Sequence, residues 1–302
     1  MALDSSQPAP ALKNEDTLAG FGYAFTAYVL WGFLPLYMKA VAHIPSSEVV
    51  AHRILWSVPI AGFVLAFRGR VGDVWIALKT PRMLGMAALT ASLISVNWLI
   101  YVWSIAAGRA LESALGYYIN PLFSVALGAI VLKERLTPIQ LAAIGLAVVA
   151  VAVLAVGAGG LPWVSLALAF SWGCYALLRK TLPVGPNQGF FLEVLLLSPV
   201  ALGYLAYLYT SGEGHFGFTG MPDMLLLMAS GLVTAVPLMI YANGAKLLKL
   251  STIGIMQYIA PTMIFLIAVF VFHEPFGPEK LVAFGFIWAA LALYSFSMLR
   301  GR

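Results

Sequence analysis

The sequence predicts an all-α integral membrane protein with ten transmembrane helices arranged as two inverted five-helix repeats. Composition is the first reason: 62% of the 302 residues are hydrophobic and only 10% are charged. A soluble domain of this size needs roughly 25% charged residues to cover its surface. The second reason is a series of long apolar runs. The third is an internal repeat, because residues 108–155 align with residues 248–295 at a constant offset of 140 without a gap.

Ten apolar runs are each long enough to cross a bilayer, which takes about 20 helical residues. Backbone polar groups in hydrocarbon must be hydrogen-bonded within the segment, so these runs are expected to be helices. The predicted spans are residues 18–40, 47–67, 82–106, 110–131, 138–156, 162–179, 187–210, 222–246, 251–272 and 278–299. They divide into a first repeat over 18–156 and a second over 162–299, after a polar stretch at 1–17 expected to be a disordered cytoplasmic tail.

Helix starts carry recognisable caps. Thr137 is followed by a proline and then by Gln140, the pattern of a capping box with Pro at the first helical position. Residues 277–279 (Gly-Pro-Glu) are predicted to play the same part in the second half. Glu134 and Glu274 precede these starts by three residues and are interpreted as polar hairpin residues at the membrane surface.

Basic residues set the predicted orientation. With the N-terminus inside, all of the 17 Lys and Arg residues except Lys39, Arg53, Arg109 and Lys280 fall on cytoplasmic segments. This bias predicts that both termini are cytoplasmic. Because each half has an odd number of spans, the second half enters from the opposite side, and the repeats are inverted. Inverted repeats favour transport, since a moving site can form where the halves meet.

Prolines within spans predict kinks at mid-depth. Pro121 and Pro261 are repeat mates, and each removes one helical hydrogen bond. Pro237 is a third breaker and the repeat mate of Asn97. Either these kinks are purely structural, or the polar groups near them contact a substrate. The candidates for substrate contact at the kinks and in the third span are Asn97, Tyr101, Tyr118, Asn120, Gln257 and Tyr258.

Ionisable residues within spans are costly and need partners. Glu48 and His52 are four residues apart, hence on one helix face. His52 and Glu193 correspond between the repeats, and either could carry a coupling proton. The alternative is a structural ion pair, for instance between Arg53 and a carboxylate, that holds two helices together.

Aromatic residues form 13% of the chain. Many of these serve packing or the interfacial belt. Trp31 and Trp172, however, are repeat mates that each precede a glycine, Gly32 and Gly173, which permits close helix approach. Both tryptophans are added to the candidate substrate-binding residues, because aromatic walls around a few polar groups suit an organic solute.

No pattern of an enzyme, a metal site or a nucleotide site is evident. The chain has one cysteine, Cys174, inside an apolar run, and no histidine spacing typical of metal ligands. We therefore expect no catalytic residues, no cofactor and no metal. The net charge of +5 is scattered over short loops, which indicates membrane topology rather than nucleic-acid binding. Expected partners are a small-molecule substrate and membrane lipid, with the protein a monomer or a homodimer.

Several strings together resemble the drug/metabolite transporter superfamily, and within it the RarD branch of EamA-type permeases. The resemblance covers nearly all of residues 18–299. The strings are LWG at 30–32, PLY at 35–37, EVVAHRILWS at 48–57, NWL at 97–99, LESALGYYINPL at 111–122 and QYIAPT at 257–262.

The resemblance implies a ten-helix inner-membrane permease in which spans 1, 3, 4, 6, 8 and 9 surround a central cavity. It also implies a small organic substrate, either an amino acid-like metabolite or an amphipathic drug such as chloramphenicol, moved by alternating access and exported. Two other hypotheses stay open. One is a membrane sensor or scaffold that transports nothing, and the other is an intramembrane enzyme, which the lack of paired catalytic groups at one depth disfavours.

Overall fold

The computed structural model describes residues 16–131, 136–157, 160–245, 247–248 and 250–300, and this part is helical without a strand. Helix ends agree with the predicted spans within two residues. In chain order the helices are α1 (Leu18–Ala40), α2 (Ser46–Phe67), α3 (Val71–Lys79), α4 (Pro81–Ala106), α5 (Ala110–Val131), α6 (Pro138–Gly157), α7 (Trp163–Thr181), α8 (Pro186–Ser211), α9 (Met221–Ala245), α10 (Leu250–Met256), α11 (Ile259–Leu266), η1 (Ile267–Val271) and α12 (Pro278–Arg300).

The described part contains nine helical segments long and apolar enough to cross a membrane, and one shorter apolar helix over Trp163–Arg179 within α7. The ninth predicted span is one of the nine, although α10, α11 and η1 share it. Together with the composition this makes the protein a multi-pass membrane protein.

Local capping explains where several helices begin and end. Gly20 donates its backbone N–H to the Thr17 hydroxyl at 3.0 Å, which caps α1. The predicted capping box at α6 is confirmed: Gln140 N–H bonds the Thr137 hydroxyl at 3.3 Å, and Thr137 N–H bonds the Gln140 side chain at 2.9 Å. Gly212 follows the last residue of α8 and terminates the helix with a φ of 73°, a left-handed conformation that glycine adopts without strain.

One helix was not predicted. The predicted spans leave residues 68–81 as a connecting segment, but residues Val71–Lys79 form α3. Val74 and Ala77 on its inner face are buried against Leu65, Leu182 and Leu192. A helix of nine residues is too short to span a bilayer, and its amphipathic pattern differs from the long apolar runs that predict spans.

The two predicted kinks differ. α5 continues through Pro121, whereas the corresponding span in the second half is interrupted between α10 and α11, at Gln257 and Tyr258. Pro261 has no N–H for the Gln257 carbonyl, and its ring crowds that carbonyl, so the chain opens there. The span then ends in a π-helical turn, η1.

Glu274 has a different role from the predicted one. His273, with φ of 54°, turns the chain after η1, and Glu274 then lies only 8% exposed. Its carboxylate accepts hydrogen bonds from the backbone N–H groups of Ala110 at 2.6 Å and Leu111 at 2.9 Å. It therefore caps the N-terminus of α5 from another part of the chain, a specific role that the hairpin interpretation did not include. Glu134 lies outside the described residues.

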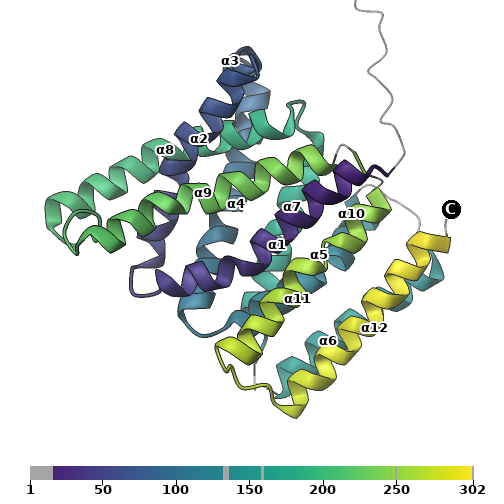
Figure 1. Cartoon of the computed structure of the whole chain (residues 1–302). Helices are drawn as coiled ribbons and strands as arrows, with labels where there is room; N and C mark the ends of the chain where they lie inside the picture. The colour runs from purple at the N-terminus through teal and green to yellow at the C-terminus, as the bar shows by residue number, and fades with distance from the viewer. Residues whose placement is uncertain (1–15, 132–135, 158–159, 246, 249, 301–302) are drawn as a thin grey trace, which may run out of the picture.

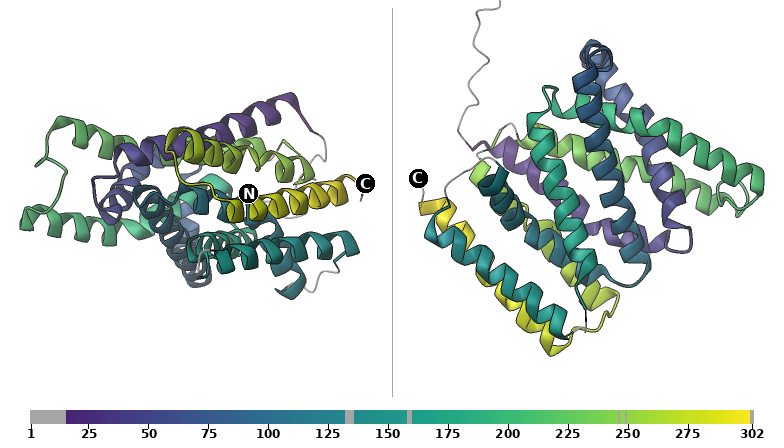
Figure 2. Two further views of the ribbon diagram at one scale, coloured as in Figure 1. Left: turned by 90° about the horizontal axis from the view of Figure 1, so that it is seen from below. Right: turned by 180° about the vertical axis from the view of Figure 1, so that it is seen from behind.

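The helices pack as a bundle with a paired edge (Figure 1). α6 and α12 lie side by side at one edge, and α2 packs on α8 at the other. Between them, α1 contacts α9 and α11, while α7 contacts α4 and α5. The hairpin of α8 and α9 extends from the bundle in both views of Figure 2.

Small residues allow this close packing. A Cβ on Gly32 would lie 2.5 Å from the Met263 sulfur, and one on Gly173 would lie 2.5 Å from the Phe123 ring. The close helix approach predicted at these two repeat mates is thus confirmed, with α11 at Gly32 and α5 at Gly173. The helices meet around a central space that becomes the candidate site.

Candidate functional site

A central, partly open cavity of about 160 Å³ lies among the helices. Its walls come from α1, α4, α5, α7, α9 and the α10–α11 region, with one residue each from α2 and α8. The lining residues are Tyr28, Trp31, Leu34, Arg53, Ile94, Asn97, Trp98, Tyr101, Tyr117, Asn120, Trp172, Tyr175, Phe190, Val233, Thr234, Leu238, Tyr241, Gln257, Ala260, Pro261 and Ile264.

Two groups of aromatic rings form parts of the wall. In one group the Trp31 ring lies 5.4 Å from Tyr241 and 5.6 Å from Tyr28. In the other group Tyr117 contacts Tyr101, at 5.7 Å, and Trp172, at 6.4 Å. Trp31 and Trp172 are repeat mates, and so are Tyr101 and Tyr241. The repeat in the sequence therefore places the same pair of ring types in both walls, and such walls suit an apolar or aromatic solute.

Asn97 lines the cavity but is already engaged. Its side-chain amide donates to the Ser171 hydroxyl at 2.9 Å and to the Leu168 carbonyl at 3.2 Å, and the side chain is fully buried. Since both acceptors are on α7, Asn97 ties α4 to α7. The structure thus gives Asn97 a packing role in addition to its place in the wall.

Other polar residues of the cavity lining have hydrogen-bonding atoms without a partner. The Asn120 amide oxygen and the Tyr101 hydroxyl are buried and have no hydrogen-bond partner in the described part of the chain. The Gln257 side chain donates to the Gly254 carbonyl at 3.0 Å, which leaves its own oxygen for another donor. Buried polar atoms without partners are unusual in folded proteins and indicate a site that a ligand or water completes.

Two of the predicted residues, Tyr118 and Tyr258, lie outside this cavity. They stack with ring centres 6.4 Å apart beside a second depression that α12 helps to form, and the Tyr118 hydroxyl pairs with Thr262 at 2.7 Å. The reason is helical phase, because successive helical residues point about 100° apart. Tyr117 and Asn120 share the cavity face of α5, so Tyr118 faces away from it.

The predicted breakers occupy different places. Pro261 lines the cavity. Pro121 and Pro237 are buried inside α5 and α9 without reaching it, although Thr234 and Leu238 on either side of Pro237 do. These two prolines therefore shape the wall rather than form it.

Glu193 and His52 also lie outside the cavity lining. Glu193 is 1% exposed and pairs with Arg179 at 3.2 Å, while it accepts a hydrogen bond from the Tyr175 hydroxyl at 3.1 Å. His52 stacks on Phe216 at 4.9 Å and accepts from the Trp56 indole at 3.2 Å. Tyr175 is a cavity residue, so it connects the Glu193 pair to the site.

The hypothesis of an Arg53–carboxylate pair is wrong for the described residues. Arg53 donates from Nε to the Thr234 hydroxyl at 2.9 Å and lies 5.0 Å above the Trp98 ring, and none of the described carboxylates pairs with it. Sequence analysis did not propose Arg53, Thr234, Tyr28 or Tyr241 for the site. Two of them carried a signal in the sequence: Tyr241 is the repeat mate of Tyr101, and Arg53 is a charged residue within a predicted span.

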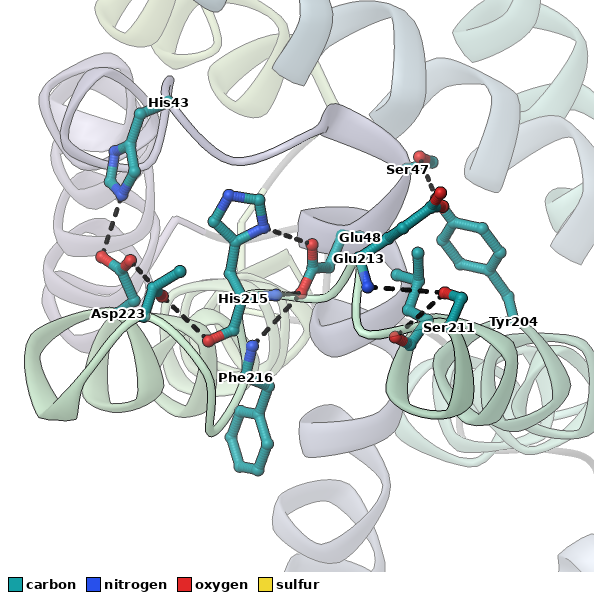
Figure 3. Close-up of polar contacts among 11 residues, drawn as sticks. His43, Ser47, Glu48, Tyr204, Ser211, Glu213, His215, Phe216 and Asp223 are labelled. Atoms are coloured by element: carbon teal, nitrogen blue, oxygen red, sulfur yellow. Dashed lines mark hydrogen bonds and ion pairs between the residues drawn. The ribbon is translucent and has the colours of Figure 1, made fainter.

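A second polar group joins two loops at one end of the bundle (Figure 3). Glu48 at the start of α2 accepts from the His215 backbone N–H at 2.7 Å and lies 2.8 Å from the His215 ring nitrogen Nδ1. His43 pairs with Asp223 at 2.9 Å. We call His43, Glu48, His215 and Asp223 the loop clasp, since they fasten the α1–α2 connection to the α8–α9 connection.

Relatives identify the family. A model of the EamA-like transporter family matches residues 18–156. Protein RarD of Streptomyces exfoliatus is 43% identical over 95% of this chain and 91% of that protein. The chain belongs to the EamA-like transporter family, in its RarD branch. It is therefore a membrane transporter by family, and its all-helical architecture agrees with that family.

Further relatives agree with this assignment. The uncharacterized transporter YojE of Bacillus subtilis is 40% identical over 96% of this chain and 98% of that protein. The chloramphenicol-sensitive protein RarD of Pseudomonas aeruginosa is 34% identical over 92% and 93%. One crystal structure, 20% identical in sequence, superposes with a TM-score of 0.60 over 93% of this chain and 98% of that chain. The superposition shows a shared fold and nothing about substrate.

Proposed function

We propose that this protein is a bacterial inner-membrane permease that exports a small organic solute by alternating access through the central cavity. The observation that carries the proposal is the cavity itself, which residues of both halves of the chain line with aromatic walls and unpartnered polar atoms. The solute is an amino acid-like metabolite or an amphipathic drug. The name of the Pseudomonas relative makes chloramphenicol a natural probe, and the export direction rests on the family resemblance.

Support for two exchanging repeats comes from the helix neighbours. If residues of the two halves are exchanged, α1 becomes α7, α4 becomes α9 and α5 becomes the α10–α11 span. The exchange turns the α1–α9 contact into the α7–α4 contact, and the α1–α11 contact into the α7–α5 contact. All four contacts are present in the structure. A fold with this internal exchange can open to either side by swapping the conformations of its halves.

The proposed orientation, with both termini in the cytoplasm and the repeats inverted, rests on the distribution of Lys and Arg. Under this orientation the loop clasp and the Glu274 cap lie at the periplasmic ends of their helices. Both fasten one half of the chain to the other, as a closed gate requires. A reporter fused to the C-terminus, active only in the cytoplasm, tests the orientation.

Flux into proteoliposomes tests the function, with radiolabelled amino acids and chloramphenicol as solutes and with or without an imposed pH gradient. We expect saturable flux of one solute class. A response to the gradient would support proton coupling, for which Glu193 and His52 are the candidates, and Glu193→Gln should then uncouple it. Binding of a solute in the cavity without flux would favour a membrane sensor. Chemical conversion of the solute would favour an enzyme.

Asn120→Leu tests whether the cavity carries that flux. The substitution keeps the branching at Cγ but removes the unpartnered amide oxygen from the wall, so flux should fall about tenfold, the usual effect of one lost hydrogen bond in a binding site. Ser92→Ala is the matched control, since Ser92 is exposed on α4 and bonds only its own helix. Wild-type flux in Asn120→Leu protein that folds and inserts normally would remove Asn120 from the site.

A further inference from the structure

The most unusual residue of the central cavity is Arg53. It is a permanent cation, yet only 3% of it is exposed, and it lies well inside α2 (Ser46–Phe67). Charged residues at such depth in a membrane protein are rare and mark functional sites when they face an internal cavity. Arg53 is one of the residues that line the central cavity.

The protein satisfies this guanidinium only in part. Nε donates to the Thr234 hydroxyl at 2.9 Å, and the Trp98 ring offers its face at 5.0 Å. Nη1, by contrast, is buried and has no partner among the described residues. A hydroxyl and an aromatic face leave the positive charge uncompensated.

The carboxylates on neighbouring elements are engaged elsewhere. Glu48, about one and a half turns earlier on α2, bonds His215. Glu193 on α8 pairs with Arg179, and Asp223 at the start of α9 pairs with His43. The cavity lining itself contains no acidic residue among those described. This lining thus carries one positive charge and no counter-charge.

Two further unpartnered atoms complete a recognition pattern. The Tyr101 hydroxyl is a donor in the same lining, and the Asn120 amide oxygen is an acceptor. A guanidinium with a free N–H and a nearby phenol matches the two oxygens of a carboxylate. The amide oxygen matches a hydroxyl or amino group on the same solute, and the aromatic walls match its apolar body.

We propose that the solute is an apolar organic monocarboxylate of the α-hydroxy or α-amino acid type, and that Arg53 binds its carboxylate. One cation in the wall matches one carboxylate, so a monocarboxylate fits better than a solute with no carboxylate or with two. This inference deepens the proposed function and rests on it for the meaning of the site, but the binding step can be measured by itself.

Binding to the purified full-length protein in detergent tests the proposal through tryptophan fluorescence, since Trp31, Trp98 and Trp172 line the cavity. The probes are 3-phenyllactate and its neutral amide, 3-phenyllactamide, which differ in charge and hardly in shape. Wild type should bind the acid at least about tenfold more tightly than the amide, the usual effect of a charge-assisted hydrogen bond. Equal binding of the two probes, or binding of neither at millimolar concentration, would overturn the proposal.

Arg53→Gln should remove the preference, with acid binding weakened about tenfold or more and amide binding changed less than about twofold. Arg109→Gln is the charge-matched control. Arg109 does not line the cavity, and its guanidinium donates to the two Glu112 carboxylate oxygens at 2.6 and 2.9 Å. This control variant should bind both probes as wild type does. If Arg53→Gln lowers the affinity of both probes equally, Arg53 acts on the fold and the proposal fails. If the variant does not fold, the affinities of wild type for the acid and the amide still test the proposal.

Flux separates this inference from the proposed function. Acid binding that depends on Arg53, without flux of the acid in proteoliposomes, keeps the site and contradicts the permease. Saturable flux of a neutral solute that is unchanged in Arg53→Gln keeps the permease and contradicts the anionic substrate.

Discussion

Glu48 and Arg53 lie on the same helix, α2, and both are almost fully buried, with 1% and 3% exposed. Their surroundings differ. Glu48 accepts hydrogen bonds from two backbone N–H groups and pairs with the His215 ring, all on one loop. The Arg53 guanidinium contacts only the Thr234 hydroxyl and the face of the Trp98 ring, and its Nη1 has no partner among the described residues. A buried charge that the protein satisfies serves the fold, whereas one that it leaves unsatisfied is available to a ligand.

The largest effect on stability is expected at the satisfied charge. Glu48→Ala leaves the His215 and Phe216 N–H groups without their acceptor, and should lower the free energy of unfolding by about 3 kcal/mol, toward the lower end for a broken buried pair because His215 is partly exposed. Thermal unfolding in detergent measures it. The control is Ser47→Ala on the same turn, which loses only the contact with the Tyr204 hydroxyl and should cost about 1 kcal/mol or less. Equal stability of Glu48→Ala and wild type would remove the distinction.

The unsatisfied charge should behave in the opposite way. Arg53→Met keeps most of the side-chain volume and removes a cation that the protein does not neutralise, so stability should rise by about 1 kcal/mol. The same variant should lose acid binding. Unfolding and probe binding, measured on one preparation, check both effects. A loss of stability as large as that of Glu48→Ala would show that Arg53 holds the helices together, as Glu48 does.

The sequence predicted the helices well because apolar runs, caps and basic residues are local signals. It missed α3, since nine residues with one apolar face resemble a polar connection. It also predicted equivalent kinks at Pro121 and Pro261, whereas only the second of these spans is interrupted, between α10 and α11. The same proline in two repeat mates gives two outcomes, a continuous helix through Pro121 and an interruption before Pro261, and a sequence match alone does not distinguish them.

The cavity was predictable where the repeat pointed to it, as for Trp31, Trp172 and Tyr101, and where polar residues interrupt apolar spans, as for Asn120 and Gln257. Tyr118 was assigned to the same site because spans hydrophobic on all sides reveal no helical phase. Arg53 was interpreted as half of an ion pair. Only the tertiary structure shows that the carboxylates near it already have partners.

A third buried charge, Glu274, lies between these two extremes, and its pH dependence sharpens the comparison. Burial raises the pKa of the Glu274 carboxyl above its ordinary value of 4.5, while the hydrogen bonds from Leu111 and Ala110 oppose that rise. A carboxyl with a raised native pKa favours the protonated form on folding. Its contribution to stability is therefore complete below the unfolded-state pKa and is lost as the pH rises through the native pKa.

Wild type should consequently lose stability relative to Glu274→Gln as the pH rises from about 4.5 toward neutrality. Between the unfolded-state pKa and the native pKa, the loss should be about 1 kcal/mol for each step of one in pH. The amide keeps an oxygen for one of the two N–H donors and does not titrate, so the difference between the two unfolding curves isolates this carboxyl. Glu279→Gln, in the first turn of α12, controls for the loss of a negative charge five residues away. A difference that grows toward acid pH instead would mean that the two hydrogen bonds outweigh burial, and Glu274 would then belong with Glu48 among the fully satisfied charges.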